Sequence, residues 1–204
     1  MAERTTKAPR GRVKRGSPPA PEKPPRVRMV AAAALLLAEK GLSGTSFSEV
    51  IERSGAPRGS IYHHFPDGKD RLTAEAIGLV GDRVLKLMRI RDGSTPQQVV
   101  HRFVDAFRVV LVKTDFKAGC AIAAVANERL GHPELGALAA AVFLAWEREL
   151  GGALVAGGMP GEKAGTAASL ILAALEGALI LCRARREIAP LDSVGNALAA
   201  FVGV

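Results

Sequence analysis

Residues suited to contacting nucleic acid are concentrated in one short stretch, from Pro57 to Phe65. Arginine can donate two hydrogen bonds to the O6 and N7 atoms of guanine, serine can reach a base or a phosphate, and glycine has no side chain to hold the backbone away from a duplex. Predicted base contacts are Arg58, Gly59 and Ser60, predicted phosphate contacts are Tyr62, His63 and Lys69, and His64 shares the same outward face. These residue types in this order suit the major groove of double-stranded DNA.

The elements around this stretch predict a helix-turn-helix. Ser46 and Glu49 have the spacing of a capping box, in which a serine hydroxyl accepts from the backbone N–H three residues later, and this predicts a helix over 46–53. Gly55 follows where a turn of three to four residues needs a positive φ angle. A second short helix is predicted over 57–64, so its polar residues would project from a rigid frame.

Residue spacing does not support other chemistries. His63 and His64 are adjacent, so on a helix they would point about 100° apart, and no third ligand stands at a matching distance along the chain. No nucleophile, base and orienting group recur at a usable spacing. The sequence therefore predicts no enzyme, no metal site and no cofactor.

Positive charge is concentrated in the first 25 residues. This arm holds seven of the 28 Lys and Arg residues and two of the 20 acidic residues, so it supplies +5 of the formal net charge of +8. It also holds six of the 12 prolines and almost no large apolar side chain, so residues 1–25 are predicted to be disordered. The arm is expected either to touch DNA phosphates or to act only as a solubilising leader.

From Arg26 onward, apolar residues recur at helical spacing without strand-like alternation, so the predicted fold is all-α with about nine helices. A helix-turn-helix DNA-binding domain is predicted over 26–75, and a ligand-binding and dimerisation domain over 76–204. Outside the helix-turn-helix, helices are predicted over 26–40, 68–91 and 161–186. Another helix is predicted to begin at Thr95, and one more is predicted to run from Pro133 to a break at Gly151 and Gly152.

The sequence also indicates a compartment. Cys120 and Cys182 lie in apolar stretches without a Cys-x-x-Cys pairing, which favours buried, reduced thiols. The N-terminus lacks the apolar core of a secretory signal. The longest apolar run, Ala167–Cys182, is shorter than the ~18–20 residues of a spanning helix and contains Glu176. We therefore expect a cytoplasmic, nucleoid-associated protein with no membrane partner.

The predicted helix over 161–186 is apolar on almost every side, so it needs cover on two faces. One face would line the core, and an identical helix from a second subunit, related by a twofold axis, would cover the other. A central helix of a monomeric bundle is the alternative. The predicted homodimer interface consists of Ile171, Ala174, Leu175, Ala178 and Leu181, with Leu198 and Phe201 from the last helix.

A small-molecule site is predicted in the same domain. A buried polar group is costly unless it is paired, so Asn127, Glu128 and Glu176, which stand amid apolar stretches, point to a ligand, although a position facing water or a neighbouring helix would also explain each of them. Aromatic residues at helical spacing fit either a pocket wall or plain core filling. The predicted ligand-binding residues are Phe103, Phe107, Cys120, Asn127, Trp146 and Glu176.

Residues 26–76 resemble the DNA-binding domain of the TetR family of bacterial repressors. The matching segments are Gly41 to Phe47, Val50 and Ile51, Ser54 to Pro66, and Lys69 to Leu72. The resemblance implies an all-helical homodimer in which the first three helices bind DNA, the variable remainder binds an inducer, and the last two long helices pair in a four-helix interface. Arg26, Thr45 and Ser46 complete the predicted DNA contacts.

Two segments, Pro57 to Pro66 and Phe116 to Cys120, are similar to the LmrA/YxaF branch of that family, whose members respond to small aromatic or drug-like compounds. The predicted function is a transcriptional repressor that binds a palindromic double-stranded DNA operator as a homodimer and is released by a small apolar or aromatic inducer. The alternative is a helical dimer that binds nucleic acid without sequence preference through its basic arm.

Overall fold

The computed structural model describes residues 23–89 and 93–203, which form nine α-helices and contain no strand. This confirms the predicted all-α fold. In chain order the helices are α1 (Pro25–Lys40), α2 (Phe47–Ser54), α3 (Ser60–His64), α4 (Lys69–Met88), α5 (Pro96–Lys113), α6 (Ala121–Asn127), α7 (Pro133–Ala156), α8 (Gly161–Arg185) and α9 (Ala189–Val202). The prediction of disorder over 1–25 falls almost entirely on residues 1–22, which lie outside the described residues.

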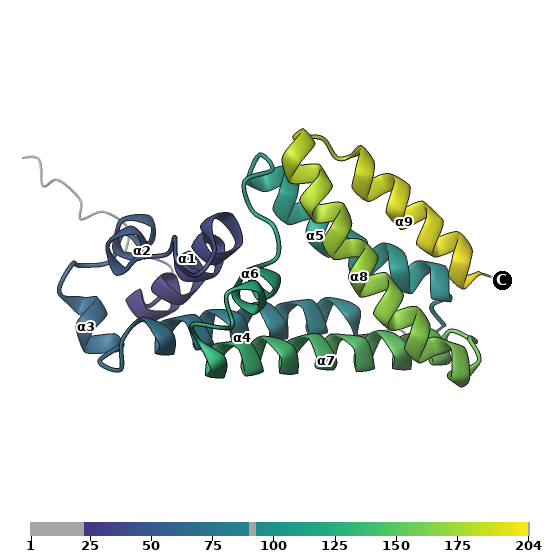
Figure 1. The fold of residues 1–204 in the computed structure, drawn as a ribbon, viewed down its shortest axis with the longest axis horizontal. Coiled ribbons are helices and arrows are strands. Elements are labelled where there is room, and N and C mark those ends of the chain that lie inside the picture. The colour runs from purple at the N-terminus through teal and green to yellow at the C-terminus, as the bar shows by residue number, and fades with distance from the viewer. Residues whose placement is uncertain (1–22, 90–92, 204) are drawn as a thin grey trace, which may run out of the picture.

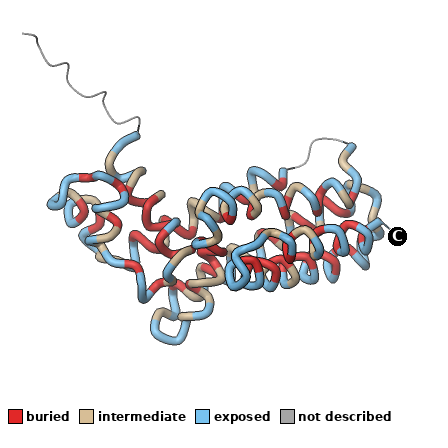
Figure 2. The backbone as a smooth tube through the Cα atoms, turned by 90° about the horizontal axis from the view of Figure 1, so that it is seen from above, coloured by how far each residue is buried: buried red, intermediate tan, exposed pale blue. Residues whose placement is uncertain are grey.

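The helices build an elongated molecule (Figure 1). The first three helices gather at one end, and α5, α8 and α9 pack on one another at the other end. Between the ends, α4 and α7 run side by side, and α6 packs against α1, α4 and α7. Buried residues line the inside along the whole length (Figure 2). The predicted domain boundary at residues 75 and 76 falls within α4, so this helix belongs to both ends of the molecule.

Several helix boundaries differ from the prediction. The helix α7 continues through Gly151 and Gly152 to Ala156, because Ala153 and Leu154 extend its buried face. Their packing outweighs the low helix propensity of glycine, about 1 kcal/mol per residue. At the ends of other helices, α3 begins three residues later than predicted, and α4 ends at Met88. The helix α6 was not predicted, because its seven residues, AIAAVAN, are too few to show a clear helical period.

Four of the seven predicted interface residues lie in the core of the single chain, which corrects that prediction. These are Ile171, Leu175, Ala178 and Leu198. They are at most 5% exposed, because α8 packs on α5, α7 and α9, and α9 packs on α5 and α8. Ala174 is half-buried, whereas Leu181 and Phe201 are exposed. Periodicity showed two apolar faces on α8 but could not say which one the chain itself covers.

The uncovered face of α8 is apolar as well. Leu170, Ile180 and Leu181 are exposed along it, and Ile180 has 66% of its surface open. The neighbouring α9 leaves 51% of Phe201 exposed. By length and composition α8 is also the one helix in the described part of the chain that could cross a membrane, but 44% of its most apolar stretch is buried by packing within the fold.

Candidate nucleic-acid interface

The helix α1 supports the two short helices that follow it. It contacts α2, α3 and α4, and Met29, Leu36 and Leu37 on its inner side are almost completely buried. Arg28 reaches from α1 to the end of α2, where its Nη1 donates to the Ser54 carbonyl oxygen at 2.5 Å. The short helices are therefore fixed to a longer one.

The turn between α2 and α3 has the predicted geometry. The Ser46 hydroxyl accepts from the Glu49 N–H at 3.3 Å, and the Glu49 carboxylate accepts from the Ser46 N–H at 3.2 Å, which completes the capping box. Hydrogen bonds from Lys40 and Ser46 lower the pKa of the Glu49 carboxyl. Gly55 ends α2 in the left-handed region, at φ 61°. The residues packed behind the turn are Val50, Ala56, Ile61 and Phe65.

On the open side of this motif, α2 and α3 enclose a shallow hollow of about 580 Å³. Its lining includes Phe47, Ser48, Glu52, Arg58 and Tyr62. Tyr62 is 68% exposed, and its ring meets the Phe47 ring edge to face with centroids 5.7 Å apart. Within the described part of the chain, Arg58 makes neither an ion pair nor a hydrogen bond. This guanidinium is therefore available to an outside partner.

Gly59 is not required by the protein's own packing. Its φ of −74° suits any residue, and a Cβ added there would have no neighbour within 4 Å. Glycine at this open position leaves the backbone accessible to the close approach of another molecule. Beyond it along α3, His63 is exposed and His64 is half-buried, and their rings lie 5.4 Å apart between centroids.

Two predicted DNA contacts point inward, which corrects their assignment. Thr45 is only 3% exposed, and its hydroxyl donates to the Gly41 carbonyl oxygen at 2.7 Å. The Lys69 ammonium donates to the Leu42 carbonyl oxygen at 2.6 Å. The physical reason is the same for both, since carbonyls at and beyond the end of α1 have no partner within a helix and recruit nearby donors.

Two more side chains that were predicted to contact DNA already interact with other residues of the protein. Arg26 donates to Glu75 at 2.5 Å, and its guanidinium lies 5.2 Å from the centre of the Phe65 ring. Ser60 donates its hydroxyl proton to the Pro57 carbonyl oxygen at 2.6 Å, so its oxygen remains free only to accept. Both side chains stay at the surface, but these interactions within the protein fix their orientation.

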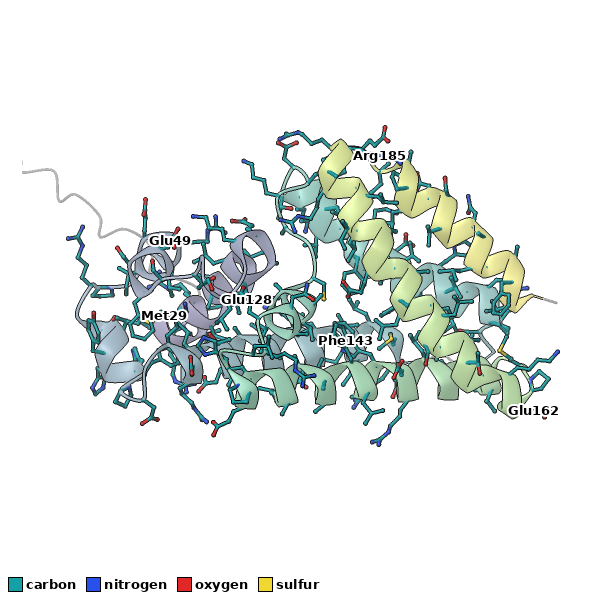
Figure 3. The ribbon with its side chains drawn as sticks, viewed as in Figure 1. Met29, Glu49, Glu128, Phe143, Glu162 and Arg185 are labelled. Atoms are coloured by element: carbon teal, nitrogen blue, oxygen red, sulfur yellow. The ribbon has the colours of Figure 1, made fainter. Side chains whose placement is uncertain are left out.

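A carboxylate from the helical body, which comprises α4 to α9, accepts hydrogen bonds from the loop after α1. Glu128, which caps the end of α6, accepts from the Leu42 N–H at 2.7 Å through Oε1, and from the Ser43 N–H at 2.9 Å and the Ser43 hydroxyl through Oε2 (Figure 3). We call these bonds the Glu128 contact. The hydrogen bonds from Ser43 are the main reason that the pKa of Glu128 lies below its usual value. Gly41, at φ 78°, fits against this carboxylate, because a Cβ there would lie 2.6 Å from Oε1.

Two other hydrogen bonds tie the end of α1 to the body. The Gly119 N–H donates to the Ala38 carbonyl oxygen at 2.9 Å, and Arg183 at the end of α8 donates to the Glu39 carbonyl oxygen at 3.0 Å. The last turn of α1 and the loop after it thus receive bonds from α6, from α8 and from the segment before α6. For Glu128 the sequence allows either a ligand contact or an ordinary position facing water or a neighbouring helix, and both of its carboxylate oxygens accept hydrogen bonds from the protein itself.

The aromatic residues predicted to bind a ligand form a packed cluster in the core. Phe103, Phe107 and Phe143 each meet Trp146 edge to face, with ring centroids 5.7–6.3 Å apart. Trp146 is fully buried, and its Nε1 donates to the Gly81 carbonyl oxygen at 3.2 Å. The alternative of plain core filling therefore describes the arrangement of Phe103, Phe107 and Trp146.

The polar residues predicted to bind a ligand differ from one another. Asn127 is exposed at the end of α6, which does not suit an enclosed site. Cys120 and Cys182 are free, buried thiols, and burial is the main reason that the pKa of Cys120 is raised. Glu176 has a buried Oε1 with no hydrogen-bond partner, and burial raises the pKa of its carboxyl to about 7. Of these residues, only Glu176 combines burial with an unsatisfied polar atom.

The described residues combine an open helix-turn-helix at one end with a helical body that is hydrogen-bonded to it, which is the architecture of a DNA-binding regulator. Comparison with known proteins agrees with this class. The model for the tetR family of bacterial regulatory proteins matches residues 29–76, and the model for the LmrA/YxaF-like C-terminal domain of transcriptional regulators matches residues 96–197.

Relatives match over nearly the whole chain. An uncharacterized HTH-type transcriptional regulator of Mycobacterium tuberculosis, Rv0196, is 41% identical over 180 residues, covering 85% of this chain and 92% of that protein. The regulator YxaF of Bacillus subtilis is 27% identical, covering 87% and 94%. Among solved structures, a TetR transcriptional regulator from Legionella pneumophila has a TM-score of 0.77 at 21% identity, covering 85% and 95%. The chain belongs to the TetR family of transcriptional regulators, with a C-terminal domain of the LmrA/YxaF-like type, and it is not an enzyme.

Proposed function

We propose that this regulator is a repressor that binds an inverted-repeat operator as a homodimer and leaves it when a small apolar or aromatic molecule binds the helical body. The observation that carries the proposal is the open face of the helix-turn-helix, where Arg58 is exposed without a partner in the described chain and Gly59 leaves its backbone uncovered. The regulator would act in the cytoplasm, on the DNA of the nucleoid.

In this proposal α3 enters the major groove. Arg58 would donate to guanine, and Gly59 would let the backbone approach the base edges. Tyr62, His63 and His64 would contact phosphates, which fix the position of the motif on the duplex without reading its sequence. Because Lys69 is bonded to Leu42, its ammonium is not among the proposed contacts. Arg26, Ser46 and Ser60 would add contacts at the edge of the same face.

A second copy of the chain would place two such motifs on one operator. We propose the uncovered faces of α8 and α9 as the dimer interface, because Leu170, Ile180, Leu181 and Phe201 expose apolar surface there. A twofold axis between the copies would set the recognition helices about 34–36 Å apart, the distance of one turn of B-DNA.

The ligand would release the operator by changing the distance between the two recognition helices. The helix α4 extends from the DNA-binding end into the body, and the Glu128 contact joins α6 to the loop after α1. A shift of α6 or α4 in the body would therefore move α1 and the motif that rests on it. For such a switch, the ligand must bind the DNA-incompetent arrangement more tightly, since equal affinity for both would shift nothing.

The proposal is tested by selecting binding sites for the full chain from a pool of random duplexes. We expect an enriched inverted repeat whose half-sites lie one helical turn apart. Enrichment of a single unrepeated site would contradict the dimeric arrangement. Binding without any enriched sequence would contradict the proposed reader and favour non-specific binding through the basic arm.

A charged substitution on the uncovered face is expected to break the dimer. Leu181→Arg would place one positive charge from each copy at the proposed interface. We therefore expect the dimer dissociation constant to rise by about tenfold or more. Sedimentation velocity over a dilution series measures this change. The control is Leu130→Arg, because Leu130 is 95% exposed in the loop after α6 and its substitution should leave the dimer intact. An unchanged dimer in Leu181→Arg would exclude this face.

A further inference from the structure

An open groove of about 520 Å³ lies between α7 and α8 on the helical body. Three apolar side chains in its lining, Phe143, Leu144 and Leu172, provide a hydrophobic wall. Two carboxylates, Glu147 and Glu176, lie along the same groove. Its size falls within the range of small-molecule sites, which are apolar clefts with a few placed polar groups.

Glu176 is the least satisfied polar side chain in this region. Its Oε1 is buried and has no hydrogen-bond partner. The neighbouring group that affects its ionisation is the Cys120 thiol, which is only a weak donor. A buried carboxylate without a strong donor costs folding free energy, and a donor that is not part of this chain would reduce this cost.

The charge of the groove indicates what kind of partner this is. None of the residues that line it carries a positive charge, so Glu147 and Glu176 have no counter-ion within the groove. A carboxylate only accepts hydrogen bonds, so an ammonium group would satisfy both its hydrogen bonds and its charge. A ligand carboxylate would be repelled by the same two residues.

The apolar wall indicates the rest of the ligand. Phe143 lies at the edge of the aromatic cluster, with its ring centroid 5.7 Å from that of Trp146. An aromatic or aliphatic body can pack on Phe143 and Leu172, and a cation close to the face of an aromatic ring gains further attraction. A purely polar amine would leave this wall exposed to water.

We propose that the groove between α7 and α8 binds an amphiphilic amine, whose protonated amino group bonds to Glu176 and whose apolar body packs against Phe143, Leu144 and Leu172. This inference rests on the proposed function in that it names the chemical class of the inducer. The binding itself is measured without DNA, so the two can fail separately.

The experiment compares three probes of one shape by isothermal titration calorimetry on the full chain at pH 8: 4-phenylbutylamine, 4-phenylbutan-1-ol and 4-phenylbutyrate. We expect the amine to bind at least tenfold more tightly than the alcohol, and the acid to bind more weakly than either. In Glu176→Gln the amine should lose at least tenfold in affinity while the alcohol is unchanged. The matched control is Glu162→Gln, at the start of α8 and outside the groove, which should bind the amine as the wild type does.

Equal binding of amine and alcohol to the wild type would overturn the inference, and this comparison does not require any variant to fold. Amine binding that survives Glu176→Gln unchanged, in a variant with a wild-type circular dichroism spectrum, would overturn it as well. A gel shift on the selected operator then separates the two proposals. Operator release by the alcohol but not by the amine would overturn this inference and leave the repressor proposal standing. Amine binding through Glu176 without operator release would support the site and contradict release by its occupant.

Discussion

Arg58→Ala is expected to weaken binding to the selected operator by at least about 30-fold while the protein stays folded and dimeric. Each bidentate contact between arginine and guanine contributes about 1–3 kcal/mol of discrimination, and a dimer on an inverted repeat makes two of them. The sum is at least about 2 kcal/mol, which corresponds to the stated factor. Arg58 lacks a partner in the described chain, so its removal should not cost folding stability.

The measurement is a gel-shift titration on the selected operator and on a scrambled duplex of the same length. Loss of a base contact should reduce the difference in affinity between the two duplexes, because only the operator offers the matching guanine. Arg148→Ala on α7 is the control, since it removes the same charge from the helical body and should leave both affinities within about twofold. A parallel loss on both duplexes would assign Arg58 to phosphate contact instead. An unchanged affinity for the operator would remove it from the interface.

The features that the sequence predicted well depend on neighbours along the chain. The capping box at Ser46 and the positive φ of Gly55 involve residues at most three positions apart, and the structure has both. A cap or a turn is specified by local chemistry, so a single sequence contains the necessary information. The helix-turn-helix was recognisable for this reason.

The features that the sequence predicted poorly depend on contacts between distant residues. Lys69 was assigned to DNA because its type and position suit a phosphate, but its ammonium bonds to a carbonyl 27 residues away. Phe103 and Phe107 show helical spacing in either a pocket or a core, and only their contacts with Trp146 distinguish the two. Glu128 was noted as a polar residue amid apolar ones, whereas its partners stand 85 and 86 residues earlier. No local pattern contains these pairings.

Glu128→Ala is expected to lower the free energy of unfolding by about 2 kcal/mol at pH 7 and to release the loop after α1. The carboxylate accepts three hydrogen bonds. A hydrogen bond to a charged group contributes about 1.5–3 kcal/mol, and the partial exposure of Glu128 to solvent reduces this contribution. Truncation also leaves the Leu42 and Ser43 amides without this acceptor. Hydrogen exchange of these two amides should therefore accelerate, and urea unfolding measures the stability.

The loss of stability in Glu128→Ala should depend on pH, whereas a loss caused by packing alone would not. Because the pKa of Glu128 is lowered in the folded protein, its contribution to stability is fully present above its usual value of 4.5 and is lost as pH falls through the lowered value. The difference in stability between the wild type and Glu128→Ala should therefore shrink as the pH falls below 4.5. Glu162→Ala, an exposed carboxylate at the start of α8, should show neither the loss at pH 7 nor this dependence on pH. If the Leu42 and Ser43 amides stay protected in Glu128→Ala, the Glu128 contact does not hold the loop, and the proposed route from α6 to the DNA-binding helices must run through α4 instead.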